Sequence, residues 1–297
     1  MRYEANESDD VDAGRVCESF RVHAYPRWSR ALAIALLAVA GASVPLLLLA
    51  VVFSTDPPLY PLVLVQLFAV FAVLPATTAW LVGRALGADL EVYEHELVLR
   101  RRGVRVEIPT AAIADVLPWR VPLPGPGLAL RMRSGRRFRQ GLQLADPGAL
   151  AAALAEIASA DGARAARAHP IVAYAAARAA VPWRWRHRLA KFVLFGLAPT
   201  LVLFNAHQHI AYGGFLGEYY LLGFASWTRT LLVYWTTIVI YLVLYAGVWR
   251  GVAEICCMTA AAVAPSLAAR ARRLAEIGCR LAYYAGVPIM VGLRFLS

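Results

Sequence analysis

Two histidines and a glutamate are the residues of this chain best suited to metal or acid–base chemistry. His207 and His209 lie in the stretch FNAHQHIAYGGFLGEYY at residues 204–220, and Glu218 follows after a glycine-rich turn. Imidazole is a common ligand for zinc, copper and haem iron, and a nearby carboxylate can act as a third ligand or a general base. Alternatively, these polar residues lie at a membrane interface and bond to neighbouring loops or lipid headgroups.

The spacing of the two histidines limits the metal hypothesis to an extended segment. Side chains two residues apart on an α-helix point about 200° apart, so the two rings cannot reach one ion. In an extended segment they lie on the same face. Our leading interpretation is therefore no cofactor, and a metal or haem site at His207, His209 and Glu218 is the alternative.

The composition is that of an integral membrane protein. Of 297 residues, 60% are hydrophobic, and the net charge is +11, an apolar fraction above that of an ordinary soluble domain. A membrane span needs about 20 mostly apolar residues. Four stretches qualify and form two hairpins: residues 31–53, 60–82, about 189 into the HQH stretch, and about 230–248.

Basic residues predict the orientation of both hairpins. Arg27, Arg30 and Arg84 flank the first hairpin, whereas its connector has no basic residue. By the positive-inside rule, the N-terminus and the middle segment are cytoplasmic, and the HQH loop faces the periplasm of a bacterial inner membrane. The second hairpin is preceded by an expected headgroup anchor made of Trp183, Arg184, Trp185, Arg186 and Arg188.

Between the hairpins, the hydrophobic period changes from helical to alternating. Residues 104–108 and 128–132 alternate apolar and polar side chains, which is typical of half-buried strands. Gly103 and Gly135 mark hairpin turns. Asp146 can cap a following helix that has Pro147 at its first position. We predict a small antiparallel β domain closed by a helix, inserted into a helical membrane protein.

The predicted boundaries divide the chain into six parts. They are an acidic N-terminal segment (residues 1–30), a first transmembrane hairpin (31–86) and the β domain (87–160). An Ala/Arg-rich linker with the anchor (161–188), a second hairpin (189–251) and a C-terminal region (252–297) follow. The C-terminal region is expected to be an amphipathic helix on the cytoplasmic surface or a re-entrant segment, in preference to a fifth span.

The order of these parts resembles bacterial membrane-anchored pleckstrin-homology-like (PH-like) domain proteins. The resemblance covers residues 31–160, where a transmembrane hairpin leads into LEVYEHELVLRRRGVRVEIPTAAIADV. It implies a membrane-associated scaffolding, sensing or assembly role, and it supplies no catalytic residues.

The β domain also carries an arginine-rich face, which could bind anionic lipid or the acidic surface of a partner protein. Its alternative is a solvated face that enforces the cytoplasmic orientation. We expect lipid and protein partners and no nucleic acid, and a non-catalytic accessory protein in preference to a membrane enzyme or redox component. The arginines of this face are Arg100, Arg101, Arg102, Arg105, Arg131, Arg133, Arg136, Arg137 and Arg139.

Overall fold

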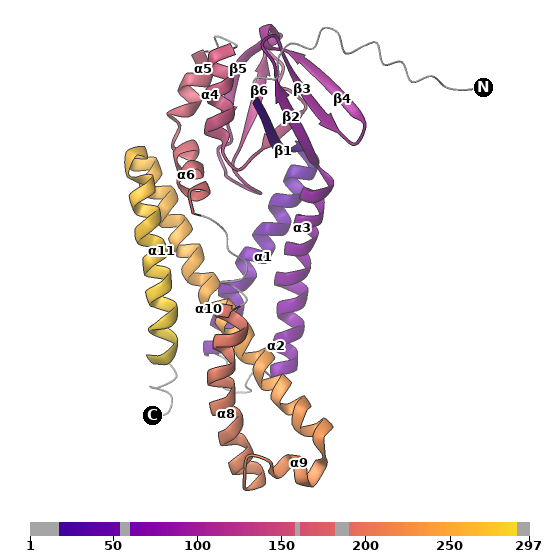
Figure 1. Cartoon of the computed structure of the whole chain (residues 1–297), viewed down its shortest axis with the longest axis vertical. Coiled ribbons are helices and arrows are strands. Elements are labelled where there is room, and N and C mark those ends of the chain that lie inside the picture. Colours follow the sequence, from indigo (N-terminus) through magenta and orange to yellow (C-terminus); the bar gives the residue numbers. More distant parts are fainter. Residues whose placement is uncertain (1–17, 54–59, 158–160, 182–189, 290–297) are drawn as a thin grey trace, which may run out of the picture. The chain divides into compact units, whose positions relative to one another are not determined.

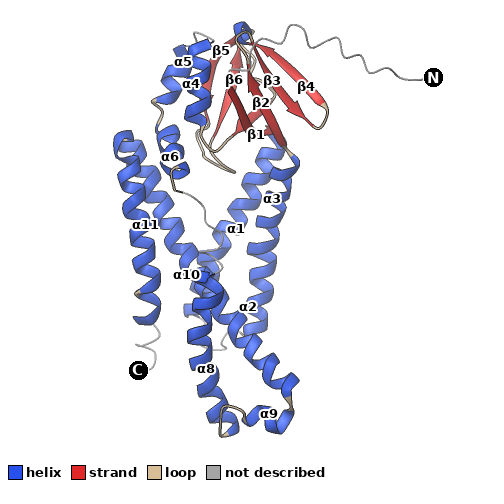
Figure 2. Cartoon of the chain, viewed as in Figure 1, coloured by secondary structure: helices blue, strands red, loops and turns tan. Residues whose placement is uncertain are grey.

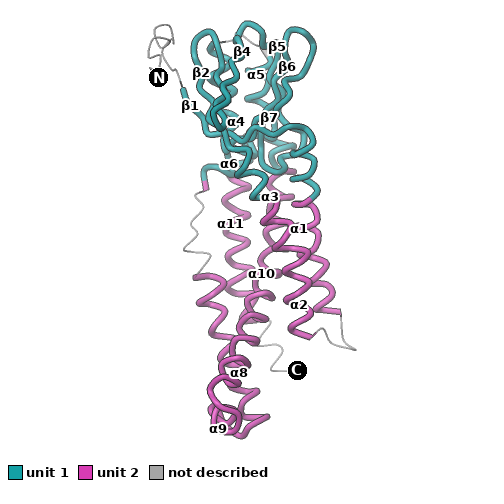
Figure 3. The backbone as a smooth tube through the Cα atoms, turned by 90° about the vertical axis from the view of Figure 1, so that its right-hand side faces the viewer, with its two compact units in different colours: residues 1–35, 79–180, 260–269 teal, residues 36–78, 181–259, 270–297 magenta. Residues whose placement is uncertain are grey.

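The computed structural model describes residues 18–53, 60–157, 161–181 and 190–289. It divides into two compact units (Figure 3). Unit 1 comprises residues 1–35, 79–180 and 260–269, and unit 2 comprises residues 36–78, 181–259 and 270–297. The first unit contains the sheet and its covering helices, and the second contains most of the residues of the long apolar helices. Figures 1 and 2 label these helices and strands.

Among the residues that the structure describes, four helices are long and apolar enough to cross a membrane, as expected for the predicted multi-pass membrane protein. A continuous helix made of α2, a π-helical segment and α3 forms the second of them, and a π-helical segment also precedes α8. The segments are α1 Arg27–Phe53, α2 Pro61–Phe68, η1 Ala69–Val73, α3 Leu74–Ala85, η3 Ala190–Leu194, α8 Phe195–Tyr212 and α10 Phe224–Val263.

Seven strands form one curled antiparallel sheet in the order β4-β3-β2-β1-β7-β6-β5 (Figure 2). The predicted turns are confirmed: Gly103 has a φ of 80° between β3 and β4, and Gly135 has a φ of 78° beyond β6, a backbone region that favours glycine. The strands are β1 Glu18–Pro26, β2 Gly87–Val92, β3 Glu96–Arg101, β4 Val104–Pro109, β5 Ile113–Pro118, β6 Gly127–Met132 and β7 Gln140–Gln143.

The first strand corrects the predicted boundary of the β domain. Residues 18–26, assigned above to an acidic N-terminal segment, form β1 at the centre of the sheet, between β2 and β7. Val22 pairs with Ala88 of β2, and His23 pairs with Gln143 of β7. The sheet is therefore not contained in residues 87–160, because the first transmembrane hairpin is inserted between its strands β1 and β2.

Helices after the last strand close the core of the sheet, as predicted for the first of them. Asp146 Oδ1 accepts hydrogen bonds from Gly148 N at 2.9 Å and Ala149 N at 3.3 Å, so Asp146 caps α4. Leu150 and Leu154 are fully buried with the strand residues. The helices are α4 Pro147–Ile157, α5 Asp161–Arg167 and α6 Pro170–Ala179.

The Ala/Arg-rich stretch is more than a linker. Ala163 and Ala166 of α5 are buried in the same core as the strands, and α5 contacts β5 while α6 contacts α4. Alanine has no side-chain entropy to lose in a helix and allows close approach, so this composition suits helices packed against a sheet. The first part of the predicted linker thus belongs to the β domain.

The C-terminal helix packs along the last transmembrane helix. Helices α10 and α11 lie side by side (Figure 1) and are joined by ion pairs and by a hydrogen bond from Tyr245 Oη to the Ala282 carbonyl at 3.0 Å. Buried Tyr283 also donates to the Lys191 carbonyl at 2.8 Å. The remaining segments are α9 Gly217–Leu222, the short η2 Thr110–Ala112 and η4 Pro265–Leu267, and α11 Ala268–Tyr284.

Candidate functional site

The structure does not bring all three predicted metal ligands together at one point. Helix α8 continues through both histidines to Tyr212, so the two rings diverge as expected for a helical His-x-His. His209 Nδ1 lies 2.9 Å from the Asn205 carbonyl oxygen, one turn earlier. The His207 ring packs against Tyr234, with ring centroids 5.3 Å apart. Within the described parts of the chain, no three His, Cys, Asp or Glu side chains are grouped to hold a metal ion.

Glu218 is buried and hydrogen-bonded on both carboxylate oxygens. Its Oε1 accepts from Ser226 Oγ at 2.8 Å and from Thr230 Oγ1 at 2.7 Å. Its Oε2 accepts from Gln208 Nε2, and its backbone N–H donates to Gln208 Oε1 at 3.3 Å. The side chain is 2% exposed, and Gln208 is fully buried. We call Gln208, Glu218, Ser226 and Thr230 the Glu218 cluster.

Burial and hydrogen bonding act in opposite directions on the pKa of the Glu218 carboxyl group. Burial raises the pKa of Glu218, because the charged form loses water. Hydrogen bonds from Thr230, Gln208 and Ser226 favour the charged form and outweigh burial, and nearby His207 acts in the same direction, so the pKa lies below its ordinary value of 4.5. The ionised carboxylate has its donors in place and joins α8, α9 and α10. The carboxylate thereby links three consecutive helices of the chain.

An aromatic cluster supports the same turn. The Phe204 ring packs edge-on against Phe215 and Trp227, at centroid distances of 5.9 and 5.3 Å. Trp227 Nε1 donates to the Phe215 carbonyl at 3.1 Å. The turn from α8 to α10 is therefore fixed by both polar and aromatic contacts.

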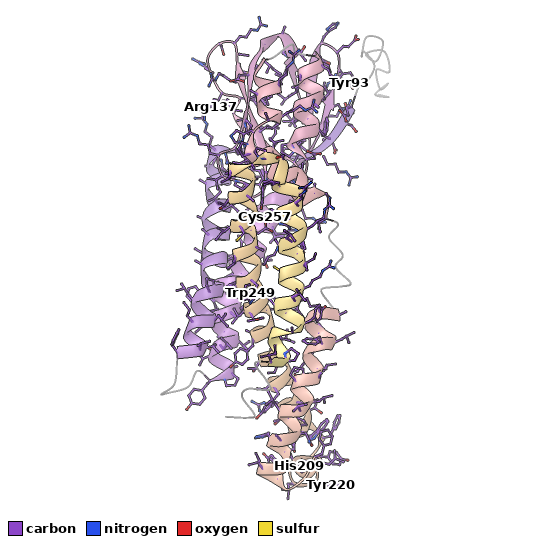
Figure 4. The ribbon with its side chains drawn as sticks, turned by 90° about the vertical axis from the view of Figure 1, so that its left-hand side faces the viewer. Tyr93, Arg137, His209, Tyr220, Trp249 and Cys257 are labelled. Carbon is purple, nitrogen blue, oxygen red and sulfur yellow. The ribbon has the colours of Figure 1, made fainter. Side chains whose placement is uncertain are left out.

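The arginine-rich face separates into two groups. Arg100, Arg101, Arg102 and Arg105 lie at the turn between β3 and β4, and Arg131, Arg133, Arg136, Arg137 and Arg139 lie around the turn between β6 and β7. Figure 4 labels Arg137 of the second group.

Neighbouring carboxylates neutralise part of this charge. Arg105 Nε lies 2.7 Å from Glu107, Arg100 lies 3.6 Å from Glu91, and Arg131 lies 4.0 Å from Asp115. These pairs are solvent-exposed and contribute little stability. Arg101, Arg102 and Val104 line two shallow hollows beside the first group.

A third site, which the sequence analysis missed, lies where the first hairpin leaves the sheet. Strand β1 ends at Pro26 and α1 begins at Arg27, and only Leu86 separates α3 from β2. The Arg30 guanidinium stacks 3.6 Å from the centroid of the Trp119 ring, and Arg30 Nη2 reaches the Val121 carbonyl at 3.5 Å. We call this contact the Arg30–Trp119 junction.

Buried packing surrounds the junction. Trp119 is buried together with Tyr25, Ala33 and Leu86. Its ring lies against the backbone of Gly127, where an added Cβ would come within 3.0 Å of the ring and 2.5 Å of the Leu142 carbonyl. Only a glycine fits this contact. In the sequence this contact corresponds to the run WRVPLPGPG at 119–127, where the proline- and glycine-rich residues 122–127 predict only a loop or a strand edge.

A four-residue ion-pair network joins α10 to α11. Arg250 and Glu254, four residues apart on α10, form an ion pair at 2.9 Å. Arg272 is 3% exposed, and it lies 2.9 Å from Glu254 and 3.1 Å from Glu276. Arg250 also contacts Glu276. The alternation of charge within the network compensates for the burial of Arg272.

The predicted headgroup anchor, Trp183, Arg184, Trp185, Arg186 and Arg188, lies outside the described residues.

No protein-family model matches this chain, and no curated protein or solved structure matches it significantly.

Proposed function

We propose that this chain is a non-catalytic scaffold of the bacterial inner membrane, which holds a PH-like domain at the cytoplasmic face for an accessory, assembly or sensing role. The observation that carries the proposal is the insertion of the first hairpin between β1 and β2. A domain that only has to be tethered to the membrane can be joined to its anchor by a flexible linker. Here the helices emerge from paired central strands, and the Arg30–Trp119 junction fixes the first turn of α1 to the sheet.

Three features support the PH-like assignment. The sheet has seven antiparallel strands, it curls around one apolar core, and a capped helix directly follows the last strand and covers that core. The cytoplasmic placement rests on the positive-inside distribution of Arg27, Arg30 and Arg84.

The edge of the sheet suits the expected protein partner. Strand β4 is an edge strand, so one side of it has no neighbouring strand. Exposed Val104 and the arginines of the β3–β4 turn lie at this edge. Positive charge beside an apolar side chain fits an acidic protein surface with an apolar centre.

Photocross-linking in native membranes tests the proposal. A photoreactive amino acid replaces Val104, and the matched control carries it at exposed Glu156 of α4. We expect one cross-linked species of defined mass from position 104, and its loss when Arg101→Glu and Arg102→Glu reverse the charge of the turn. Absence of any specific cross-link from position 104 would overturn the scaffold proposal.

The competing enzyme hypothesis has its own measurement. Elemental analysis and an absorption spectrum of the detergent-purified protein are compared with those of a His207→Ala, His209→Ala variant. Stoichiometric metal or a Soret band that disappears in the variant would replace the scaffold by a membrane enzyme or redox component. Equal spectra and equal metal content in both proteins are the expected result.

A further inference from the structure

The turn from α8 to α10 buries its carboxylate and exposes large apolar side chains. Two of its polar side chains, Glu218 and Gln208, are 2% and 0% exposed, whereas Tyr220 is 76% and Leu221 70% exposed. Asn205 and His209, at the end of α8, are exposed polar residues. Figure 4 shows Tyr220 at this turn, near His209. Exposed large apolar and aromatic side chains cover the turn: Ile210, Phe215, Leu216, Tyr219, Tyr220, Leu221, Leu222 and Phe224.

The turn also lacks surface charge. Between Lys191 and Arg229, Glu218 is the only Asp, Glu, Lys or Arg in the sequence, and its carboxylate is enclosed by the Glu218 cluster. A loop in water normally places its charged residues outward, and an exposed apolar surface of this extent marks contact with a membrane or a protein. The enclosed carboxylate and the uncharged exterior together suit surroundings of low polarity.

This surface is continuous with the expected lipid-facing sides of the two spans. Leu201 and Val202 of α8 are exposed, as are Leu232 and Val233 of α10, and both helices are long and apolar enough to cross a membrane. Tyrosine is enriched where a bilayer meets water, since its ring is apolar and its hydroxyl is polar. A protein interface, by contrast, has a polar and charged rim.

We propose that the α8–α10 turn is immersed in the outer leaflet of the bilayer, with the exposed side of α9 contacting lipid at the boundary between acyl chains and headgroups. The Glu218 cluster is then the internal polar support that keeps the backbone of this turn in place without water. The loop that the sequence analysis assigned to the periplasm becomes part of the membrane-embedded surface. This inference rests on the four apolar helices and not on the scaffold proposal.

Depth measurement by spin-label accessibility tests this placement. A genetically encoded spin-labelled amino acid replaces Leu221 in the otherwise natural chain, so the cysteines stay in place. The matched control is Val104 on β4, which is 62% exposed. Both proteins are reconstituted in liposomes, and relaxation is measured with oxygen, which concentrates in lipid, and with a water-soluble nickel chelate.

The two outcomes are distinct. We expect the Leu221 label to favour oxygen over nickel by severalfold and the Val104 label to favour nickel. If the Leu221 label is as accessible to nickel as the Val104 label, the proposal is overturned. This is the result expected if a soluble partner, and not lipid, normally covers this face. Spectral broadening that grows with the protein-to-lipid ratio would also overturn it, because a second copy would then cover α9. Tyr220 provides a second labelling position if the Leu221 protein does not fold.

Discussion

Arg30 of α1 stacks on Trp119 at 3.6 Å, and the two residues come from segments far apart in the sequence. One lies in the first turn of a helix suited to cross the membrane, and the other follows strand β5. The pair therefore connects the beginning of the first hairpin to the sheet from which it emerges.

Trp119→Ala should destabilise the β domain by about 3–5 kcal/mol, the range for removing a buried tryptophan. Trp119 is 3% exposed and carries the Arg30 contact, whereas Trp28 is 72% exposed. Trp28→Ala is therefore the matched control, with an expected change within about 0.5 kcal/mol. Thermal unfolding of both variants, followed by circular dichroism in detergent, measures the difference. Equal unfolding temperatures would show that the junction contributes nothing.

Gly127→Ala should disturb the same junction from the backbone side. An added Cβ meets the Leu142 carbonyl and the Trp119 ring, whereas at Gly87 the nearest atom is 3.5 Å away. Overpacking of a fixed site costs about 1–3 kcal/mol. Gly87→Ala, in strand β2 of the same sheet, should be tolerated. The comparison uses the unfolding temperature, and a Gly127→Ala protein as stable as the Gly87→Ala protein would contradict the packing described.

These junction residues indicate which parts of the fold are predictable from sequence. The cap at Asp146, the turns at Gly103 and Gly135 and the apolar spans follow from local rules of capping, backbone conformation and hydropathy. Strand β1 was missed although Phe20, Val22 and Ala24 alternate with polar residues, because its partners come only after the whole first hairpin. Pairing across such an insertion is a tertiary property that no local pattern contains.

The Glu218 site shows the same limit. The sequence drew attention to His207, His209 and Glu218 by residue type, but the closest partners of the carboxylate are Gln208, Ser226 and Thr230. Serine, threonine and glutamine occur throughout any chain, so their type alone does not mark a site. Only the fold reveals that their donors converge on one oxygen pair.

Glu218→Gln should destabilise the α8–α10 turn by about 1–3 kcal/mol, the cost of an unsatisfied buried polar group. The amide cannot accept from Gln208, Ser226 and Thr230 together, since one of its two ends is a donor. The control Glu156→Gln changes an exposed carboxylate on α4 and should have no measurable effect. Protease resistance of the turn in detergent reports the local change. Unaltered resistance would argue that the carboxylate is dispensable.

Acid should weaken the same turn. The pKa of Glu218 is lower in the folded protein than its ordinary value of 4.5, because its hydrogen bonds outweigh burial. Its contribution to stability is therefore complete above pH 4.5 and is lost as the pH falls through the folded pKa. The Glu218→Gln variant should lack this part of the acid dependence. The measurement is the unfolding temperature in detergent as a function of pH for both proteins. The same pH dependence in both would refute a stabilising role for the ionised Glu218 carboxylate.

Arg272→Leu should separate α11 from α10. Glu254 and Glu276 are partly exposed and would keep only Arg250 as a partner from this network. Loss of charge-assisted hydrogen bonds of this kind costs about 1.5–3 kcal/mol. Exposed Arg273 is the matched control, because Arg273→Leu leaves the network intact. Amide hydrogen exchange in α11 is expected to rise in the first variant and to stay unchanged in the second. Similar exchange in both would contradict a stabilising role for the network.

The central claim, that the sheet is held by the transmembrane hairpin without a flexible linker, has a direct measurement. Spin labels at Val104 of β4 and Leu32 of α1 are both at exposed positions of unit 1, and pulsed dipolar spectroscopy gives the distribution of distances between them in liposomes. The account predicts one narrow distribution that broadens in the Trp119→Ala variant. A broad distribution in the unmodified protein would contradict it.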